Sequence, residues 1–438
     1  MIRLMIAIGV MLITALPLRA EIAIQDVTTP GGIKAWLVEE HSLPFVALEM
    51  RFKGGASLDP EGKRGAATLM VSLLEEGTGD MDARAFAEAT ESIAASFGFD
   101  ASNDGISVSA RFLTETRDEA VDLLNAALTA PNFDDLAVER VRAQLISSIQ
   151  ASLTDPGDIL SRKVAAMTWG DHPYGSSSDG TIASVSALTR DDLIASHRAT
   201  LAKDRVYVSA VGDITAQELG QLIDELLGSL PDEGAPLIGQ ATYQAEPGVT
   251  VVPYETPQSV VRFGHRGIAE TDPDFLTAYV LNEIFGGGTD SRLHSEVREK
   301  RGLTYGIGTW LASRPYGDTL GGQFATGNAR VGEAIEVIET EWAKISENGI
   351  SQQELDDAKK YLTGAYPLRF DSNAAIANIL ASMQFRGQTK DYVIDRNDRV
   401  NAITLDEINR VAARLYRPED LFFVIVGQPE GLSEPPAN

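Results

Sequence analysis

The chain has 438 residues, no cysteine, and 63 acidic against 37 basic residues, which gives a formal net charge of -26. This length predicts two or more domains, and the lack of cysteine excludes disulfide bonds and thiolate metal sites. The negative charge disfavours nucleic-acid binding and contact with anionic lipid head groups.

The first 20 residues have the layout of a secretory signal peptide. Arg3 precedes an apolar run that closes with the small residue Ala20. The run is too short and too poorly flanked for a membrane anchor, which needs about 20 apolar residues. We therefore assign residues 1–20 to a cleavable signal and expect no membrane contact after cleavage. A bacterial periplasm fits an exported chain without cysteine better than a disulfide-rich extracellular setting.

A helix is predicted over residues 64–79, RGAATLMVSLLEEGTG. On a helix, Thr68 and Ser72 lie one turn apart on one face, with Val71 beside them. Several large apolar residues fill the rest of this segment, and Gly77 is expected to end it. From the residues alone, this is a buried core helix with a stripe of small side chains.

The pattern of the first half of the chain recurs in the second half. Residues 43–62 resemble residues 256–275, and residues 188–214 resemble residues 403–429, in the same order and at nearly the same spacing. Repeats of this kind indicate homologous structural units.

We predict two homologous α+β domains, at residues 21–232 and 248–438, joined by a linker at 233–247 that is rich in Pro, Gly and polar residues. Alternating strands bracket long helical patterns in each half. This order favours a mixed or antiparallel sheet covered by helices. Two such domains on a long linker can face each other across a cavity.

A second helix is predicted at 289–301, TDSRLHSEVREKR, followed by a strand at 303–312. Arg298, Lys300 and Arg301 lie in its last turn, where basic side chains complement the helix dipole. The glycines before this helix form either an ordinary loop or a place where a ligand can approach the backbone closely. They are Gly286, Gly287 and Gly288.

Common catalytic motifs do not occur in the sequence. The five histidines form no H-x-x-H pair, and neither a G-x-S-x-G elbow nor a P-loop is found. A single histidine of this kind is more often a surface or helix-end residue than a metal ligand.

The repeated halves, together with residues 54–79 and the segment FGGGTDSRLHSEVREKRGLTYGI at 285–307, resemble the insulinase/pitrilysin-type zinc metallopeptidases, the inverted zincins. In that family the first-domain helix carries a His-x-x-Glu-His motif. The resemblance places the two histidine ligands at Thr68 and Ser72, the catalytic glutamate at Val71, and a third ligand near Ser148.

These substitutions imply that the chain holds no catalytic zinc and needs no cofactor of its own. Zinc requires imidazole, thiolate or carboxylate donors, whereas Thr68, Ser72 and Ser148 offer neutral hydroxyls. Val71 cannot act as a general base.

The second half keeps a feature that many family members carry, an arginine and a tyrosine seven positions apart. Arg298 and Tyr305 have this spacing. The resemblance implies that they hold substrate carbonyls and stabilise the oxyanion formed during peptide hydrolysis. In some two-subunit members, one chain carries the zinc motif and the other carries this pair.

The sequence thus predicts a periplasmic, non-catalytic subunit that acts in trans with a zinc-bearing HxxEH paralogue. Its predicted ligand is a peptide substrate, and no nucleic-acid partner is expected. Gly286, Gly287 and Gly288 are candidate substrate-binding residues. The alternative is a peptide-binding or scaffold protein derived from this fold that has no role in catalysis. An active zinc protease would need ligands that the sequence does not show.

Overall fold

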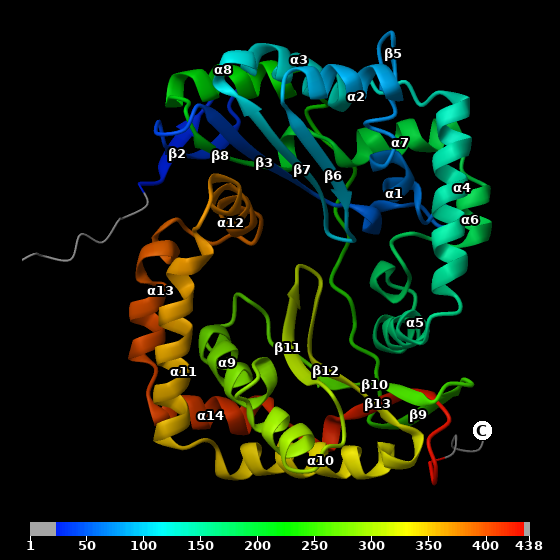
Figure 1. Cartoon of the computed structure of the whole chain (residues 1–438), viewed down its shortest axis with the longest axis vertical. Coiled ribbons are helices and arrows are strands. Elements are labelled where there is room, and N and C mark those ends of the chain that lie inside the picture. The colour runs from blue at the N-terminus through cyan, green and yellow to red at the C-terminus, as the bar shows by residue number, and fades with distance from the viewer. Residues whose placement is uncertain (1–22, 433–438) are drawn as a thin grey trace, which may run out of the picture.

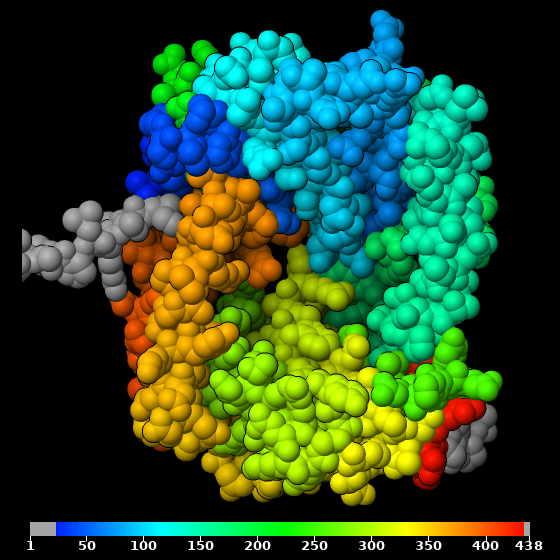
Figure 2. Space-filling view, in the orientation of Figure 1, coloured from blue at the N-terminus to red at the C-terminus, as the bar shows by residue number. Residues whose placement is uncertain are grey.

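The computed structural model describes residues 23–432, so the predicted signal peptide at 1–20 lies outside the described residues. Two halves, each built on one β-sheet, face each other, and the space-filling view shows the hollow between them (Figures 1 and 2). Between residues 23 and 432, no helix has both the length and the apolar character needed to cross a membrane.

The first sheet has six strands in the order β1-β2-β8-β3-β7-β6. Strands β2 and β8 are parallel, and all other neighbours in the sheet are antiparallel. Alternation in β3 sends Val46, Leu48, Met50 and Phe52 into the core. The strands are β1 (Gln25–Thr28), β2 (Lys34–Glu39), β3 (Phe45–Lys53), β6 (Ser96–Ala101), β7 (Gly105–Leu113) and β8 (Val206–Gly212).

Helices cover the outer face of this sheet, and two of them, α3 and α8, lie side by side across it (Figure 1). Helix α8 begins with a capping box in which Thr215 and Glu218 satisfy each other's backbone amides. A small hairpin is formed by β4 (Gly77–Thr78) and β5 (Met81–Asp82). The helices of the first half are α1 (Ala66–Val71), α2 (Ala83–Ser92), α3 (Arg117–Thr129), α4 (Asp135–Ser152), α5 (Pro156–Trp169), α6 (Ile182–Ser186), α7 (Arg190–Thr200) and α8 (Ala216–Leu227).

The second sheet repeats the topology of the first. Its order, β9-β13-β10-β12-β11, matches β2-β8-β3-β7-β6, and the first pair is again the parallel one. This match confirms the predicted fold class of two homologous α+β halves. The strands are β9 (Gly248–Pro253), β10 (Gln258–Arg266), β11 (Ile307–Arg314), β12 (Gly317–Gly327) and β13 (Phe422–Gly427).

Trp342 of α10 is at the centre of the second core. It is fully buried and packs against the rings of Phe263, Phe285 and Tyr416. The helices of this half are α9 (Phe275–Asn282), α10 (Val331–Asn348), α11 (Gln352–Ala365), α12 (Asn373–Phe385), α13 (Asp391–Ala402) and α14 (Leu405–Leu415), with wider π-helical turns η5 (Glu283–Gly287) and η6 (His294–Glu299).

The two halves exchange helices. Helix α5 of the first half packs on β10 and β13, and α12 of the second half packs on β3 and β8 (Figure 1). Ser209 of β8 donates a hydrogen bond of 2.6 Å to the carbonyl oxygen of Ala377, and Gln384 donates one of 2.8 Å to Val208. Each sheet therefore has a helix of the opposite half against its inner face. Residues 233–247, which join the halves, contain no helix or strand.

Three predicted elements differ from the structure. The helix predicted at 289–301 begins only at residue 292 and consists mainly of the π-helical turn η6. Helix α1 ends at Val71 instead of continuing to Gly77, because the chain tightens into turns in which Leu73 donates to Met70 and Leu74 to Val71. The strand predicted at 303–312 begins only at Ile307, since the residues before it form a turn.

Glu49 lies on the inner face of β3, and burial raises the pKa of its carboxyl group to about 7. A raised folded-state pKa means that Glu49 stabilises the fold below about pH 4.5, and that this contribution is lost as the pH rises through about 7. As the pH rises from 5 to 8, Glu49→Gln should therefore gain stability relative to the wild type. The gain in the free energy of unfolding should be at most about 3 kcal/mol. Urea unfolding at both pH values measures this difference, with Glu88→Gln on the exposed face of α2 as the control. Identical pH profiles of Glu49→Gln and the wild type would contradict it.

Candidate functional site

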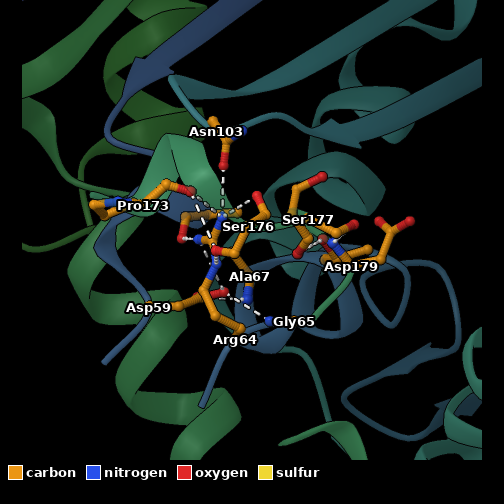
Figure 3. A network of polar contacts seen from close by, with 12 residues as sticks. Asp59, Arg64, Gly65, Ala67, Asn103, Pro173, Ser176, Ser177 and Asp179 are labelled. Atoms are coloured by element: carbon orange, nitrogen blue, oxygen red, sulfur yellow. Dashed lines mark hydrogen bonds and ion pairs between the residues drawn. The ribbon is translucent and has the colours of Figure 1, made fainter. Parts of the chain in front are cut away.

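The start of α1 is held by a network of polar contacts around Arg64 (Figure 3). The Arg64 guanidinium donates to the carbonyl oxygen of Ala56, to Asn103 at 2.8 Å, and to the carbonyl oxygen of Pro173 at 3.0 Å. Its Nε donates to the hydroxyl of Ser176 at 3.0 Å. The network ties α1 to the segment 173–179, which lies over this end of the helix.

Asp59 supplies the acceptors for the first amides of α1. Its carboxylate accepts hydrogen bonds from the backbone amides of Gly65, at 2.9 Å, and Ala67, at 3.0 Å. Burial raises the pKa of Asp59 to about 6, although these amides and Arg64 act in the opposite direction. Gly65 has φ of +95°, and a Cβ atom there would lie 2.5 Å from the carbonyl oxygen of Asp179, so glycine is required.

The side chains at the predicted zinc positions are already committed to other contacts. The Thr68 hydroxyl donates to the carbonyl oxygen of Ser178 at 2.9 Å, and the Ser72 hydroxyl donates to the carbonyl oxygen of Thr68 at 2.8 Å. Val71 is 3% exposed, and Ser148 is exposed on α4. These residues do not fit a zinc ion, because none offers a donor that zinc prefers. In the part of the chain that the structure describes, no group of three or more His, Asp or Glu residues is placed to hold a metal.

Val71→Glu is expected to lower the free energy of unfolding by about 3 kcal/mol, because it places a carboxylate in an apolar core without a partner. Urea denaturation measures the change. Ser72→Glu, on the exposed side of the same turn, is the matched control and should alter stability by no more than about 0.5 kcal/mol. Equal effects of the two variants would show that Val71 is not the core residue described here.

Arg298 and Tyr305 line one groove of about 480 Å³ in the second half. The Tyr305 side chain is 89% exposed, so no packing holds it in the core. Nη1 of Arg298 lies 2.8 Å from Nε2 of His294. The groove thus combines a guanidinium and a phenol that are both open to solvent.

The three basic residues at the end of the predicted helix have different surroundings. Lys300 and Arg301 both pair with the carboxylate of Glu296, at 2.5 and 2.6 Å. Arg298 has no carboxylate partner within 4.0 Å between residues 23 and 432. Electrostatic pairing therefore accounts for Lys300 and Arg301 but leaves Arg298 available.

The backbone around this groove is fixed by Thr304. Its hydroxyl accepts from the amide of Gly306 at 3.1 Å and donates to the carbonyl oxygen of Ala325 at 2.7 Å. This turn places Tyr305 on the surface immediately before β11. The sequence analysis did not identify the contact between His294 and Arg298. The spacing of four residues could have indicated it, because it places both side chains on one helix face.

The three glycines lie outside this groove. A Cβ atom on Gly286 would lie 2.4 Å from Oγ1 of Thr309, so this position needs glycine for packing against β11. Cβ atoms on Gly287 and Gly288 would lie within 3 Å of the Glu283 carboxylate. Close packing around η5 therefore explains part of the glycine run.

The predicted site residues lie in two separate places. The groove at Arg298 and Tyr305 is lined only by residues of the second half, so Thr68, Ser72 and Ser148 do not contribute to it. The chain by itself brings Arg298 and Tyr305 together, but it does not bring them together with the positions predicted for the zinc site.

Both halves of the chain match known protein families. Residues 35–181 match the family model described as Insulinase (Peptidase family M16), and residues 187–362 match the model described as Peptidase M16 inactive domain. A Helicobacter pylori protein named non-peptidase homolog YmxG is 26% identical over 392 residues, which cover 89% of this chain and 90% of that protein. An uncharacterized zinc protease of Streptomyces coelicolor is 25% identical over 396 residues, covering 89% of this chain and 86% of its own length.

A solved structure shows the same architecture. The crystal structure of a peptidase M16 inactive domain from Pseudomonas fluorescens has a TM-score of 0.88 and 27% sequence identity. The match covers 95% of this chain and 100% of that chain.

Proposed function

Because the chain belongs to peptidase family M16, as an inactive member with hydroxyl side chains at the zinc-ligand positions, we propose that it is the non-catalytic subunit of a periplasmic zinc peptidase. In this proposal it forms a heterodimer with a zinc-bearing HxxEH paralogue. It contributes substrate binding and transition-state support, while the partner supplies the metal.

The observation that carries the proposal is the exposed Arg298 and Tyr305 pair. Both side chains line one groove, and neither is used to stabilise this chain through a carboxylate or a packed core. A guanidinium and a phenol donate hydrogen bonds to a peptide carbonyl oxygen, and these bonds strengthen as negative charge develops on it.

In this proposal the peptide substrate lies in the hollow between the halves that Figure 2 shows. Enclosure of this kind would select short or unfolded chains over folded proteins. The net charge of -26, where it lines the hollow, would favour basic peptides. Rapid cleavage of a folded protein by the assembled pair would contradict selection by enclosure.

The test is the metal content and peptidase activity of the purified mature chain, alone and mixed with an H-x-x-E-H paralogue from the same organism. We expect no zinc and no activity alone, and activity in the mixture above that of the paralogue alone. Stoichiometric zinc and activity of the chain alone would overturn the proposal. An unchanged paralogue activity in the mixture would favour a binding protein without a role in catalysis.

A further inference from the structure

A second cavity, of about 380 Å³, lies between the halves and is distinct from the groove at Arg298. Helix α5 and the segment 173–179 form one wall, and the inner face of β10, β11 and β12 forms the other. Figure 1 shows α5 beside this sheet. Because each half supplies a wall, the cavity depends on the exchanged packing of α5.

Arg262 of β10 lies on the sheet side of this cavity. Its guanidinium carbon is 4.9 Å from the centroid of the Trp310 ring, and Nη2 donates to Oε1 of Gln323 at 2.7 Å. These contacts hold the guanidinium plane in one orientation without neutralising its charge. The pKa of Arg262 is lowered, first by burial and then by the nearby positive charge of Arg314.

Arg314, at the end of β11, is the second cation of the cavity. Its guanidinium lies over the Tyr174 ring at 5.3 Å, and the Tyr174 hydroxyl donates to Asp104. Neither Arg262 nor Arg314 forms an ion pair within 4.0 Å in the described part of the chain. Arg262 is half-buried and has no carboxylate partner among the described residues, and a partly buried charge is costly unless it is paired. Arg314 is exposed, and the carboxylate that acts on it is that of Asp104, which forms no ion pair with it.

Two hydrogen-bond donors on this cavity are also unused. Nε of Arg262 and the hydroxyl of Thr168 are buried and have no partner within the described residues. Thr168 is only 1% exposed, and both residues line the cavity. A buried donor without an acceptor is destabilising, so a ligand that brings an acceptor oxygen to either donor would be stabilised there.

The opposite wall limits which anion fits. Asp158 and Asp179 line the cavity together with Ser176, Ser177 and Ser178. Arg162 of α5 also lines it and donates to Ser152, so this wall carries two carboxylates and one guanidinium. These carboxylates disfavour a compact multivalent anion such as phosphate. The C-terminal end of a peptide suits both walls. Its carboxylate brings a single negative charge to the arginines, and its backbone amides supply donors for the carboxylates.

We propose that this cavity binds the free C-terminal carboxylate of a peptide, with Arg262 and Arg314 as the cationic partners and Trp310 as the supporting surface. Arginine suits this role because its fork of donors matches the two oxygens of a carboxylate. The inference rests on the proposed function, in that it assumes a peptide in the hollow, and it specifies which end of the peptide is held.

The test is direct binding by the isolated full-length mature chain, measured by fluorescence anisotropy. The probe is a short peptide of Gly, Ser and Ala whose N-terminus carries an uncharged fluorophore of the boron-dipyrromethene type. It is prepared with a free C-terminal carboxylate, with a C-terminal amide, and as an amide that contains one internal Glu. We expect the free acid to bind about tenfold to a hundredfold more tightly than either amide.

Arg262→Gln should remove the preference for the free acid, and Arg262→Lys should retain only part of it. Arg266→Gln, on the exposed end of the same strand and outside the cavity, is the charge-matched control and should bind like the wild type. Circular dichroism and thermal unfolding establish that each variant is folded.

Equal binding of the free acid and the plain amide, or no binding of either, would overturn the inference. Binding of the Glu-containing amide as tightly as the free acid would overturn the assignment to a peptide terminus in favour of an acidic side chain. The peptidase assay of the Arg298 variant with the zinc-bearing paralogue does not depend on this cavity. The proposed function can therefore hold even if no C-terminal carboxylate binds here.

Discussion

Arg298→Ala is expected to lower kcat/KM of the complex with an H-x-x-E-H paralogue about 100-fold to 1000-fold, the usual effect of removing one donor from an oxyanion site. Arg298 has no carboxylate partner in the described residues, so its loss should leave this chain as stable as before. Steady-state peptidase kinetics measure the change. A titration of the partner with the variant separates activity from assembly.

Arg301→Ala is the matched control for this experiment. Arg301 is three residues away, pairs with Glu296, and does not line the groove, so activity should remain close to that of the wild type. Tyr305→Phe removes only the phenol hydroxyl and should also reduce kcat/KM. Equal activity of the Arg298→Ala and Arg301→Ala complexes would show that helix-end electrostatics explains the whole basic cluster.

Trp169→Ala is expected to lower the free energy of unfolding by about 3–5 kcal/mol, the range for removing a large buried aromatic side chain. Trp169 ends α5, is 5% exposed, and packs edge-on against Tyr174 and Tyr243 with ring centroids 5.8 and 5.9 Å away. Its ring also reaches Gly317 of β12 in the opposite half, where a Cβ atom would lie 2.5 Å from it. Because this contact joins the halves, small-angle scattering should show a larger radius of gyration under conditions where the variant remains folded.

Tyr361→Ala serves as the control for aromatic truncation, because Tyr361 is 61% exposed on α11 and should change stability by no more than about 0.5 kcal/mol. A loss below about 1 kcal/mol for Trp169→Ala, with unchanged dimensions, would contradict a role for Trp169 in holding the halves together.

The sequence predicts the sheets well because their strands alternate and because the pattern occurs twice. Alternation in β3 is read directly from Val46, Leu48, Met50 and Phe52, all of which are buried. The repeat extends this interpretation to the second half, where the strand order and directions are the same.

The exchange of α5 and α12 cannot be predicted in this way. Its contacts join residues far apart in the chain, such as Ser209 and Ala377, and local periodicity says nothing about which sheet a helix will cover. The cavity at Arg262 was missed for the same reason, because its donors Arg262 and Thr168 come from different halves. The early end of α1 was also missed, since its turns depend on local hydrogen bonds that leave the apolar pattern unchanged.

Completion of the active site in trans requires Tyr305 to lie near the metal of the partner subunit. The chain has no cysteine, so Tyr305→Cys can carry a single spin label, and Asp118→Cys on the exposed start of α3 provides the control. The measurement is the electron paramagnetic resonance spectrum of each labelled chain bound to a copper-substituted HxxEH paralogue. We expect strong broadening of the label at position 305 and little at position 118. Equal spectra at the two positions, with the complex formed, would contradict completion of the site in trans.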